Sequence, residues 1–171
     1  TSMAASLGFF DVEHGRFDAP SLNGVGLGER MLPRVVSSAT QVGATEHGIP
    51  VFHAIGDNQA SFLGSAKDPA HCLLINIGTG GQTSAYSGRY CEVEGLETRP
   101  FPGGGYLLVG ASLAGGKAYA MLEAFFRSVL ESIGEVESVP PLYGKMERLL
   151  DRFRPSAHPL RVCTRFYGTR K

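Results

Sequence analysis

Three apolar runs of this sequence each lead into a short segment of glycine and small polar residues, and this order limits the folds open to the chain. The runs lie at residues 51–55, 72–77 and 106–109. The first precedes a predicted short helix at 59–66. The second is apolar enough to predict a central strand, and it precedes a partner strand at 82–86. The third leads into a long amphipathic helix at about 115–133, with Gly134 where a C-cap belongs. Strands that alternate with helices in this way predict an α/β fold.

Smaller elements complete this prediction. Apolar residues on either side of a Gly15 turn predict a short hairpin within residues 1–18. The glycine- and proline-rich stretch 19–50 predicts short helical pieces and connections. Further along the chain we expect a loop at 87–105, an amphipathic helix at about 142–153 and a strand at 160–166. The polar break Lys67-Asp68-Pro69 is the expected boundary between two lobes.

The composition excludes several classes of protein. Hydrophobic residues make up 43% of the 171 and charged residues 19%, which predicts a packed core. Sixteen basic residues balance sixteen acidic ones, which argues against binding to nucleic acid or to a membrane surface. No apolar run reaches the roughly 18 residues of a membrane span. The three cysteines and five histidines have no disulfide or zinc-site spacing, so no metal ligand is predicted and a reducing cytoplasm is the expected location.

Asp57 is the first candidate for chemistry. It lies between Gly56 and Asn58, just after an apolar run, and α/β proteins bind ligands beyond the carboxyl ends of their strands. A carboxylate in that position can accept the proton of an attacking hydroxyl group. The alternative interpretation is that Asp57 only caps the helix that begins near Gln59.

Two glycine-rich segments are the next candidates. Gly78, Gly80 and Gly81 flank Thr79 in a turn whose backbone N–H groups could approach an anion. A plain β-hairpin is the alternative for this turn, which matches neither of the common phosphate-loop motifs. Residues 110–116 are small and precede the long helix, where they either bind a phosphate at its N-terminus or only allow close packing.

Together these motifs resemble the middle of the FGGY carbohydrate kinases, within the superfamily of ATPases that includes actin and hexokinase. The Gly-Asp-Asn-Gln-Ala run at 56–60 is similar to the family's catalytic motif. Residues 76–81 are similar to its second phosphate-binding hairpin, and residues 110–116 to a segment at the floor of the nucleotide site. Residues 168–170 are similar to a Gly-Thr-Arg loop of the family. Within the family the likeness is nearest to the sedoheptulokinases.

The resemblance implies a ribonuclease H-like, actin-like ATPase fold and a set of functional residues. It assigns Asp57 as the catalytic base, with Asn58 and Gln59 beside the sugar. The phosphates of ATP, with Mg²⁺, would be held between the lobes by cofactor-binding residues, which are Gly78, Thr79, Gly80, Gly81 and Gly115. The implied partner is a small-molecule sugar rather than nucleic acid or membrane, and a homodimer is left open.

The resemblance also implies that the chain is a fragment. Residues 1–69 would form the end of the first lobe and residues 70–171 the beginning of the second. A first phosphate loop and an adenosine motif are expected outside the chain, so the chain alone is expected to be inactive. The alternatives are another kinase of the family, acting on xylulose or glycerol, a non-catalytic binding module, and an assembly module with an actin-like lobe.

Overall fold

The computed structural model describes residues 1–38, 40–134, 137–154, 156, 158, 162–163 and 166–168. The chain divides into two compact units. Unit 1 comprises Thr1–Ile75 and Thr83–Gly110, and unit 2 comprises Asn76–Gln82 and Ala111–Lys171. No helix in the described part of the chain is long and apolar enough to cross a membrane. The lobe boundary at residue 69 concerns the intact protein and stays a prediction.

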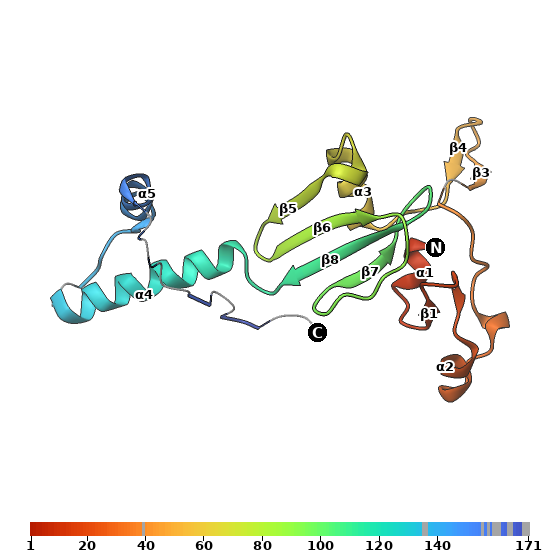
Figure 1. Ribbon diagram of the computed structural model, residues 1–171, viewed down its shortest axis with the longest axis horizontal. Coiled ribbons are helices and arrows are strands. Elements are labelled where there is room, and N and C mark those ends of the chain that lie inside the picture. Colours follow the sequence, from red (N-terminus) through yellow and green to blue (C-terminus); the bar gives the residue numbers. More distant parts are fainter. Residues whose placement is uncertain are drawn as a thin grey trace. The chain divides into compact units, whose positions relative to one another are not determined.

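A four-stranded sheet with the order β5-β6-β8-β7 contributes residues to both units (Figure 1). Its strands are β5 (Leu73–Ile77), β6 (Gly81–Ser87), β7 (Glu97–Pro100) and β8 (Tyr106–Ser112). Strand β7 pairs antiparallel with β8 but was predicted as loop, because Glu97, Arg99 and Pro100 do not resemble a strand. Such residues are typical of edge strands, where charge and proline are tolerated.

Strand β5 was predicted to be central, and the prediction is wrong for the sheet of this chain. Leu73, Ile75 and Ile77 are 60%, 60% and 73% exposed, and β5 is an edge strand. The apolar sequence of a strand indicates that it will be covered, but it does not identify the covering element.

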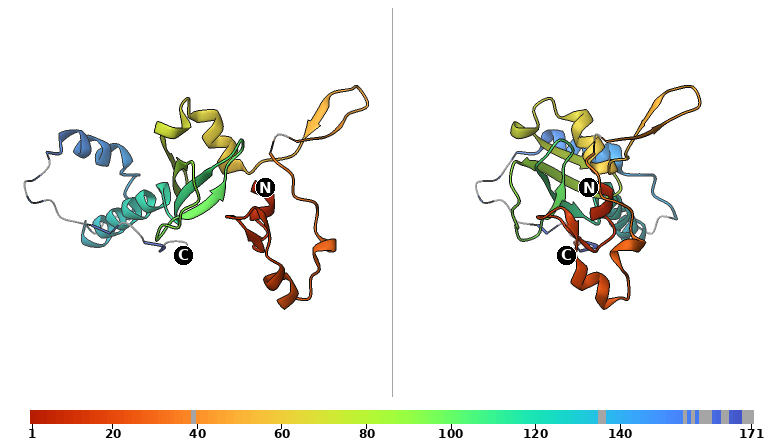
Figure 2. Two further views of the ribbon diagram at one scale, coloured as in Figure 1. Left: turned by 45° about the vertical axis from the view of Figure 1, so that its right-hand side comes forward. Right: turned by 90° about the vertical axis from the view of Figure 1, so that its right-hand side faces the viewer.

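The N-terminal part of unit 1 consists of small elements (Figure 2). The predicted hairpin is confirmed, with Phe10 opposite Phe17. Short helices occur within residues 19–50 as predicted, but the strand β3 there was missed because Gly43 interrupts its pattern. In chain order, the helices and strands of this N-terminal part are α1 (Ser2–Ala5), β1 (Phe10–Asp11), β2 (Arg16–Phe17), α2 (Ala19–Gly24), the 3-10 turn η1 (Glu29–Met31) and β3 (Gln41–Ala44).

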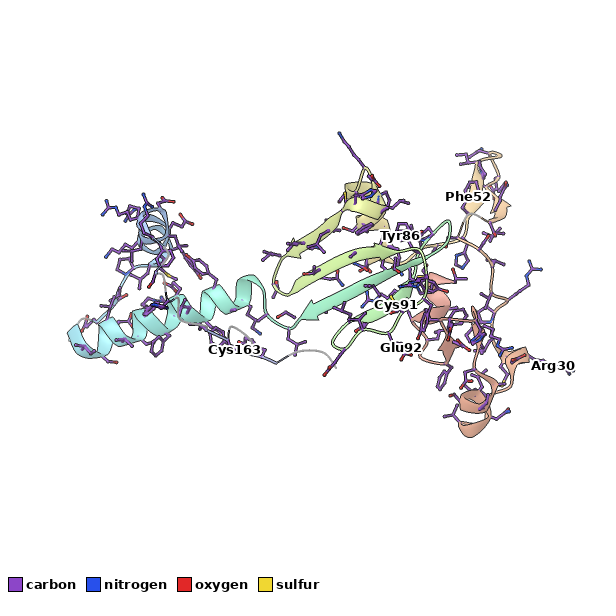
Figure 3. All side chains as sticks on the ribbon, viewed as in Figure 1. Arg30, Phe52, Tyr86, Cys91, Glu92 and Cys163 are labelled. Atoms are coloured by element: carbon purple, nitrogen blue, oxygen red, sulfur yellow. The ribbon has the colours of Figure 1, made fainter. Side chains whose placement is uncertain are left out.

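Strand β4 (Pro50–Phe52) is shorter than the predicted strand at 51–55. It pairs with β3 in a two-stranded hairpin, and its side chains are exposed, including that of Phe52, labelled in Figure 3. His53 therefore follows the strand rather than lying inside it. Four residues separate β4 from Asp57, so this acid does not directly follow a strand.

Helix α3 (Asp57–Ser65) packs on the core of unit 1. The core contains Phe62, Phe101, Leu107 and Val109, all of them buried. The rings of Phe62 and Phe101 meet edge to face, with 5.7 Å between centroids, a favourable arrangement of aromatic quadrupoles. The 3-10 turn η2 (Pro69–His71) follows, and the carboxylate of Asp68 accepts the N–H of Ala70 at its start.

Unit 2 contains the two predicted amphipathic helices, α4 (Gly116–Gly134) and α5 (Tyr143–Arg152). The buried carboxylate of Glu123 in α4 accepts the N–H of Leu142, the N-cap of α5, at 2.9 Å. On α4, Phe125 and Ile133 of the predicted apolar face are exposed. The strand predicted at 160–166 falls largely outside the described residues. Cys72, Cys91 and Cys163 carry free thiols, and Cys163 is exposed (Figure 3).

Candidate functional site

Asp57 is the first residue of α3, and its carboxylate is exposed. Its Oδ1 accepts the backbone N–H of Asn58 at 2.7 Å. None of the described residues donates a hydrogen bond to Oδ2. The N-cap is Gly56, so Asp57 supports the first turn of the helix without being its cap. This geometry leaves one carboxylate oxygen open to a proton donor from solvent or substrate.

The two residues after Asp57 point into the interior of unit 1. Asn58 and Gln59 are buried, with exposed fractions of only 6% and 4%. Asn58 Nδ2 donates to Ser84 Oγ of β6 at 3.1 Å. Gln59 Nε2 donates to the carbonyl oxygen of Pro100, at the end of β7, also at 3.1 Å. Both amides therefore bind protein atoms.

A glycine precedes the acid in this motif because the side chain of Gln59 occupies the space that a side chain at residue 56 would need. A Cβ atom at Gly56 would overlap the side-chain oxygen of Gln59 and lie 3.2 Å from its Cδ. The backbone N–H of Gly56 donates to the buried hydroxyl of Ser2 at 3.2 Å. A side chain at residue 56 would thus displace the amide of Gln59 from the core.

In unit 2 the glycine hairpin is bound to the start of α4. The N–H of Gly116 donates to the carbonyl of Gly78 at 2.7 Å, and that of Gly115 to the carbonyl of Thr79 at 2.9 Å. The structure shows no cis peptide bond in the described chain, and in a trans peptide the N–H points opposite to the carbonyl. The N–H groups of Thr79 and Gly80 therefore point away from α4.

This packing requires glycine in the helix start. A Cβ atom at Gly115 would overlap the carbonyl oxygen of Gly80 and lie 2.9 Å from that of Gly78, and at Gly116 it would lie 3.1 Å from Gly78 O. The small residues at 110–116 thus allow close packing, one of the two predicted alternatives. The N–H groups of Gly115 and Gly116 donate to the hairpin. The positive end of the α4 dipole still faces the hairpin and favours an anion near it.

A hollow of about 400 Å³ in unit 2 lies against the hairpin. Gly78, Gly80 and Gly81 line it together with Gln82 and Ser112. Glycine residues let an anion approach the backbone closely, but Thr79 and Gly115 are not among the described residues that line this hollow. No group of three or more acids, histidines or cysteines in the described residues is arranged to hold a metal ion.

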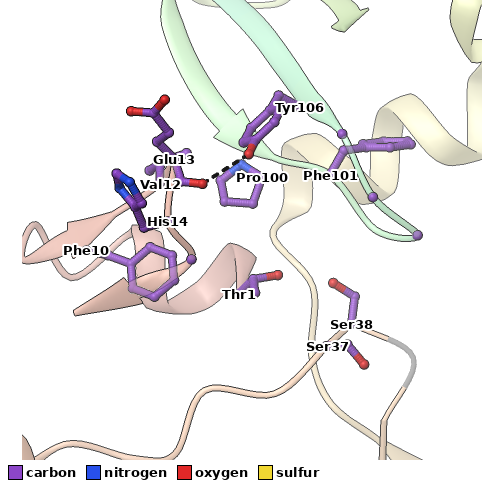
Figure 4. A pocket seen from close by; sticks show the side chains of 14 residues that line it. Thr1, Phe10, Val12, Glu13, His14, Ser37, Ser38, Pro100, Phe101 and Tyr106 are labelled. Atoms are coloured by element: carbon purple, nitrogen blue, oxygen red, sulfur yellow. Dashed lines mark hydrogen bonds between the residues drawn. The ribbon is translucent and has the colours of Figure 1, made fainter. Parts of the chain in front are cut away.

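A second hollow, of about 480 Å³, lies in unit 1 (Figure 4). Phe10, His14, Pro100 and Tyr106 line it, and Tyr106 donates to the carbonyl of Glu13 at 3.4 Å. The predicted site residues are absent from its described lining. The sequence did not indicate this hollow, because residues 103–105, which help to line it, are predicted only as part of the loop at 87–105. Those three glycines all have positive φ.

The structure places the remaining candidates as follows. Asp57, Asn58 and Gln59 lie in unit 1, whereas the hairpin and Gly115 lie in unit 2. Of the Gly-Thr-Arg segment at 168–170, only Gly168 lies within the described residues, with φ 79°.

Comparison with known proteins finds kinases among the proteins similar to this chain. No family model matches the sequence. Over 105 residues the chain is 31% identical to a glycerol kinase from Methylibium petroleiphilum, which covers 57% of this chain and 21% of that protein.

Two solved structures have similar folds. A xylulose kinase from Rhodospirillum rubrum matches 98% of this chain and 35% of its own, with a TM-score of 0.77 and 18% identity. A xyloylose kinase from Brucella ovis matches 73% of this chain and 27% of its own, with a TM-score of 0.65 and 24% identity.

The relative and the structural neighbours are sugar kinases of the FGGY type. These kinases have the actin-like ATPase fold, and the mixed α/β architecture of this chain agrees with it. The chain spans about a fifth of the glycerol kinase and about a third of the xylulose kinase.

Proposed function

We propose that this chain is the central part of an ATP-dependent sugar kinase that phosphorylates a primary hydroxyl group. The observation that carries the proposal is the first turn of α3. There an exposed carboxylate with one open oxygen stands beside two buried, hydrogen-bonded amides. The kinase relatives support the same reaction class.

In this reaction Asp57 acts as the general base. The sugar hydroxyl donates its proton to Asp57 Oδ2 while its oxygen attacks the γ-phosphorus of ATP. The new O–P bond forms as the bond between the γ-phosphorus and the β–γ bridging oxygen breaks, and ADP leaves. A positioned base contributes about 10²–10⁴-fold to the rate. Asn58 and Gln59 are proposed to shape the sugar side of the site from beneath Asp57.

The glycine hairpin is the proposed phosphate site. The N–H groups of Thr79 and Gly80 would donate to phosphate oxygens, with Gly78 and Gly81 leaving space for close approach. Gly115 serves the same site by allowing the hairpin to lie on the helix start. Mg²⁺ bound to the nucleotide phosphates would neutralise their charge during the transfer, and Mg²⁺ commonly binds through substrate phosphates and few protein ligands.

The proposal also covers the identity of the sugar, the division into lobes and the location of the enzyme. The sugar is sedoheptulose, phosphorylated at its 7-hydroxyl, on the strength of the sequence likeness at residues 3–10, 56–61 and 109–116. Xylulose and glycerol are the competing substrates, as the names of the similar kinases suggest. Residues 1–69 belong to the first lobe and residues 70–171 to the second, and the enzyme acts in the cytoplasm.

The test is an isosteric substitution, Asp57→Asn, in the full-length protein. Turnover of sedoheptulose, xylulose and glycerol is compared with that of Asp68→Asn, because Asp68 is also an exposed acid at the start of a helical turn. We expect Asp57→Asn to lower kcat about 10²–10⁴-fold and Asp68→Asn to change it less than twofold. Equal turnover of the two variants would exclude Asp57 as the base. Absence of transfer to all three acceptors by the wild type would exclude a kinase for these substrates.

A further inference from the structure

The first turn of α3 is held by hydrogen bonds to three other segments of unit 1. The N–H of Gly56 donates to Ser2 Oγ of α1, the amide of Asn58 to Ser84 Oγ of β6, and the amide of Gln59 to Pro100 O of β7. The three donor–acceptor distances are 3.1 to 3.2 Å. The bonds join residues 26 to 54 positions apart in sequence, so they fix the turn to the tertiary structure.

Ser84 is the least exposed member of this set. The residue is 1% exposed, in a strand whose next-door residue Thr83 is exposed. A buried hydroxyl without a partner costs free energy, and an alanine would fill nearly the same volume. The hydrogen bond from Asn58 accounts for a polar side chain at this buried position.

The helix geometry connects this hydrogen bond to Asp57. Successive helical residues are rotated by about 100° around the axis. With Asn58 and Gln59 both directed inward, Asp57 lies roughly 150° from the midpoint between them, on the outer side of the helix. A rotation of α3 about its axis would break the inward bonds, so the bonds fix the side of the helix from which the Asp57 side chain projects.

We infer that Ser84 is a positioning residue that holds the base of the proposed kinase reaction in place through Asn58. This inference rests on the proposed function of Asp57. Ser84 would not touch the sugar or ATP. Its hydroxyl accepts from the Asn58 amide, which is part of the same helical turn as the carboxylate. A displacement of about 1 Å in a reacting group can lower turnover about 10²-fold.

The inference predicts a specific pattern of kinetics in the full-length protein. Ser84→Ala should lower kcat about 10- to 100-fold and leave the KM for ATP within about twofold of the wild-type value. The matched control is Thr83→Ala, which removes a hydroxyl from the exposed neighbour in the same strand and should change kcat less than twofold. Ser84→Cys keeps an acceptor at this position, though a larger and weaker one, and should lie between wild type and Ser84→Ala.

A double-mutant cycle separates positioning from general destabilisation. A residue that acts through Asp57 has no further effect once the base is removed. Ser84→Ala should therefore change single-turnover rates less than twofold in the Asp57→Asn background. An equal loss in both backgrounds would show a merely structural role and would overturn the inference.

Further outcomes test the function proposed for Asp57 and the role inferred for Ser84 separately. If Asp57→Asn abolishes turnover while Ser84→Ala retains wild-type kcat, the proposed function stands and the inference fails. If Asp57→Asn retains wild-type kcat, the function proposed for Asp57 and the inference fail together. Should Ser84→Ala not fold, Ser84→Cys decides, and a wild-type kcat in that variant would overturn the inference.

Discussion

Gly115 donates its backbone N–H to the carbonyl of Thr79 at 2.9 Å, and a Cβ atom at residue 115 would overlap the hairpin backbone. The start of α4 and the glycine hairpin therefore form one backbone-to-backbone contact. The contact turns two hairpin carbonyls toward the helix and, through the planarity of the peptide, two N–H groups away from it.

Gly115→Ala should damage the phosphate site while leaving the sugar site intact. The methyl group must push the hairpin away from α4, and overpacking of this kind costs about 1–3 kcal/mol. We expect the KM for ATP in the full-length protein to rise about tenfold, measured by initial rates at saturating sugar, with the KM for sugar nearly unchanged.

The control for this substitution is Gly88→Ala. Gly88 has no atom within 4 Å of a Cβ and no positive φ, so alanine should be tolerated there with an unchanged KM for ATP. A Gly115→Ala protein that folds and binds ATP like the wild type would refute the assignment of the hairpin as the phosphate site.

Phe62→Ala should be the more destabilising member of a neighbouring pair in α3. Phe62 is fully buried against Phe101, whereas Leu63 is 49% exposed. Truncation of a buried phenylalanine costs about 3–5 kcal/mol, and Leu63→Ala should cost less than about 1 kcal/mol. The chain has no tryptophan, so urea unfolding followed by circular dichroism is the suitable measurement. Similar unfolding midpoints for the two variants would show that Phe62 is not part of the core.

Some elements of the fold could be predicted from the sequence and others could not, for physical reasons. Helix α4 and the hairpin before β6 were predictable because helical periodicity and glycine turns are local properties. Strand β7 was not, since its pairing with β8 is a tertiary property that the charged residues Glu97 and Arg99 conceal.

The candidate site divides in the same way. Asp57 and the hairpin were identifiable as motifs, but the contacts of Asn58 and Gln59 depend on Ser84 and Pro100, which lie 26 and 41 residues away. No local pattern marks Ser84. The hollow of Figure 4 combines residues from both ends of unit 1 and was likewise not identifiable from the sequence.

The β1–β2 hairpin should lose stability in acid through Asp11. The backbone N–H of His14 donates to Asp11 Oδ1 at 3.0 Å, and its ring nitrogen lies 2.8 Å from Oδ2. These bonds, the backbone one foremost, lower the pKa of Asp11 below its ordinary value. Because the folded pKa lies below the unfolded one, the contribution is present above about pH 3.9 and is lost as the pH falls through the folded pKa.

An NMR titration of the Asp11 carboxyl carbon measures this directly. We expect its midpoint below the usual Asp range. His14→Ala should raise the midpoint only in part, because the backbone N–H of residue 14 remains. Asp11→Asn should remove the acid dependence of the Gly15 and Phe17 amide shifts. A midpoint at the ordinary Asp value would show that the hydrogen bonds do not form in solution.

The row of exposed apolar side chains on β5 should make the 171-residue chain self-associate. Leu73, Ile75 and Ile77 alternate along the strand, so they share one face, and an apolar, uncharged edge strand is a template for pairing with another chain. Light scattering should therefore show concentration-dependent association. Ile75→Lys should reduce it, whereas Thr83→Lys, which places the same charge on the neighbouring strand, should not.

The same substitution separates the proposed kinase from an assembly module. If further strands of a longer kinase cover this row, Ile75→Lys should destabilise the full-length protein by several kcal/mol, because an unpaired charge would be buried. In an assembly module the row would remain exposed in the full-length protein, and Ile75→Lys would abolish its association at little cost in stability. A 171-residue chain that stays monomeric at high concentration would contradict the role given to the β5 edge.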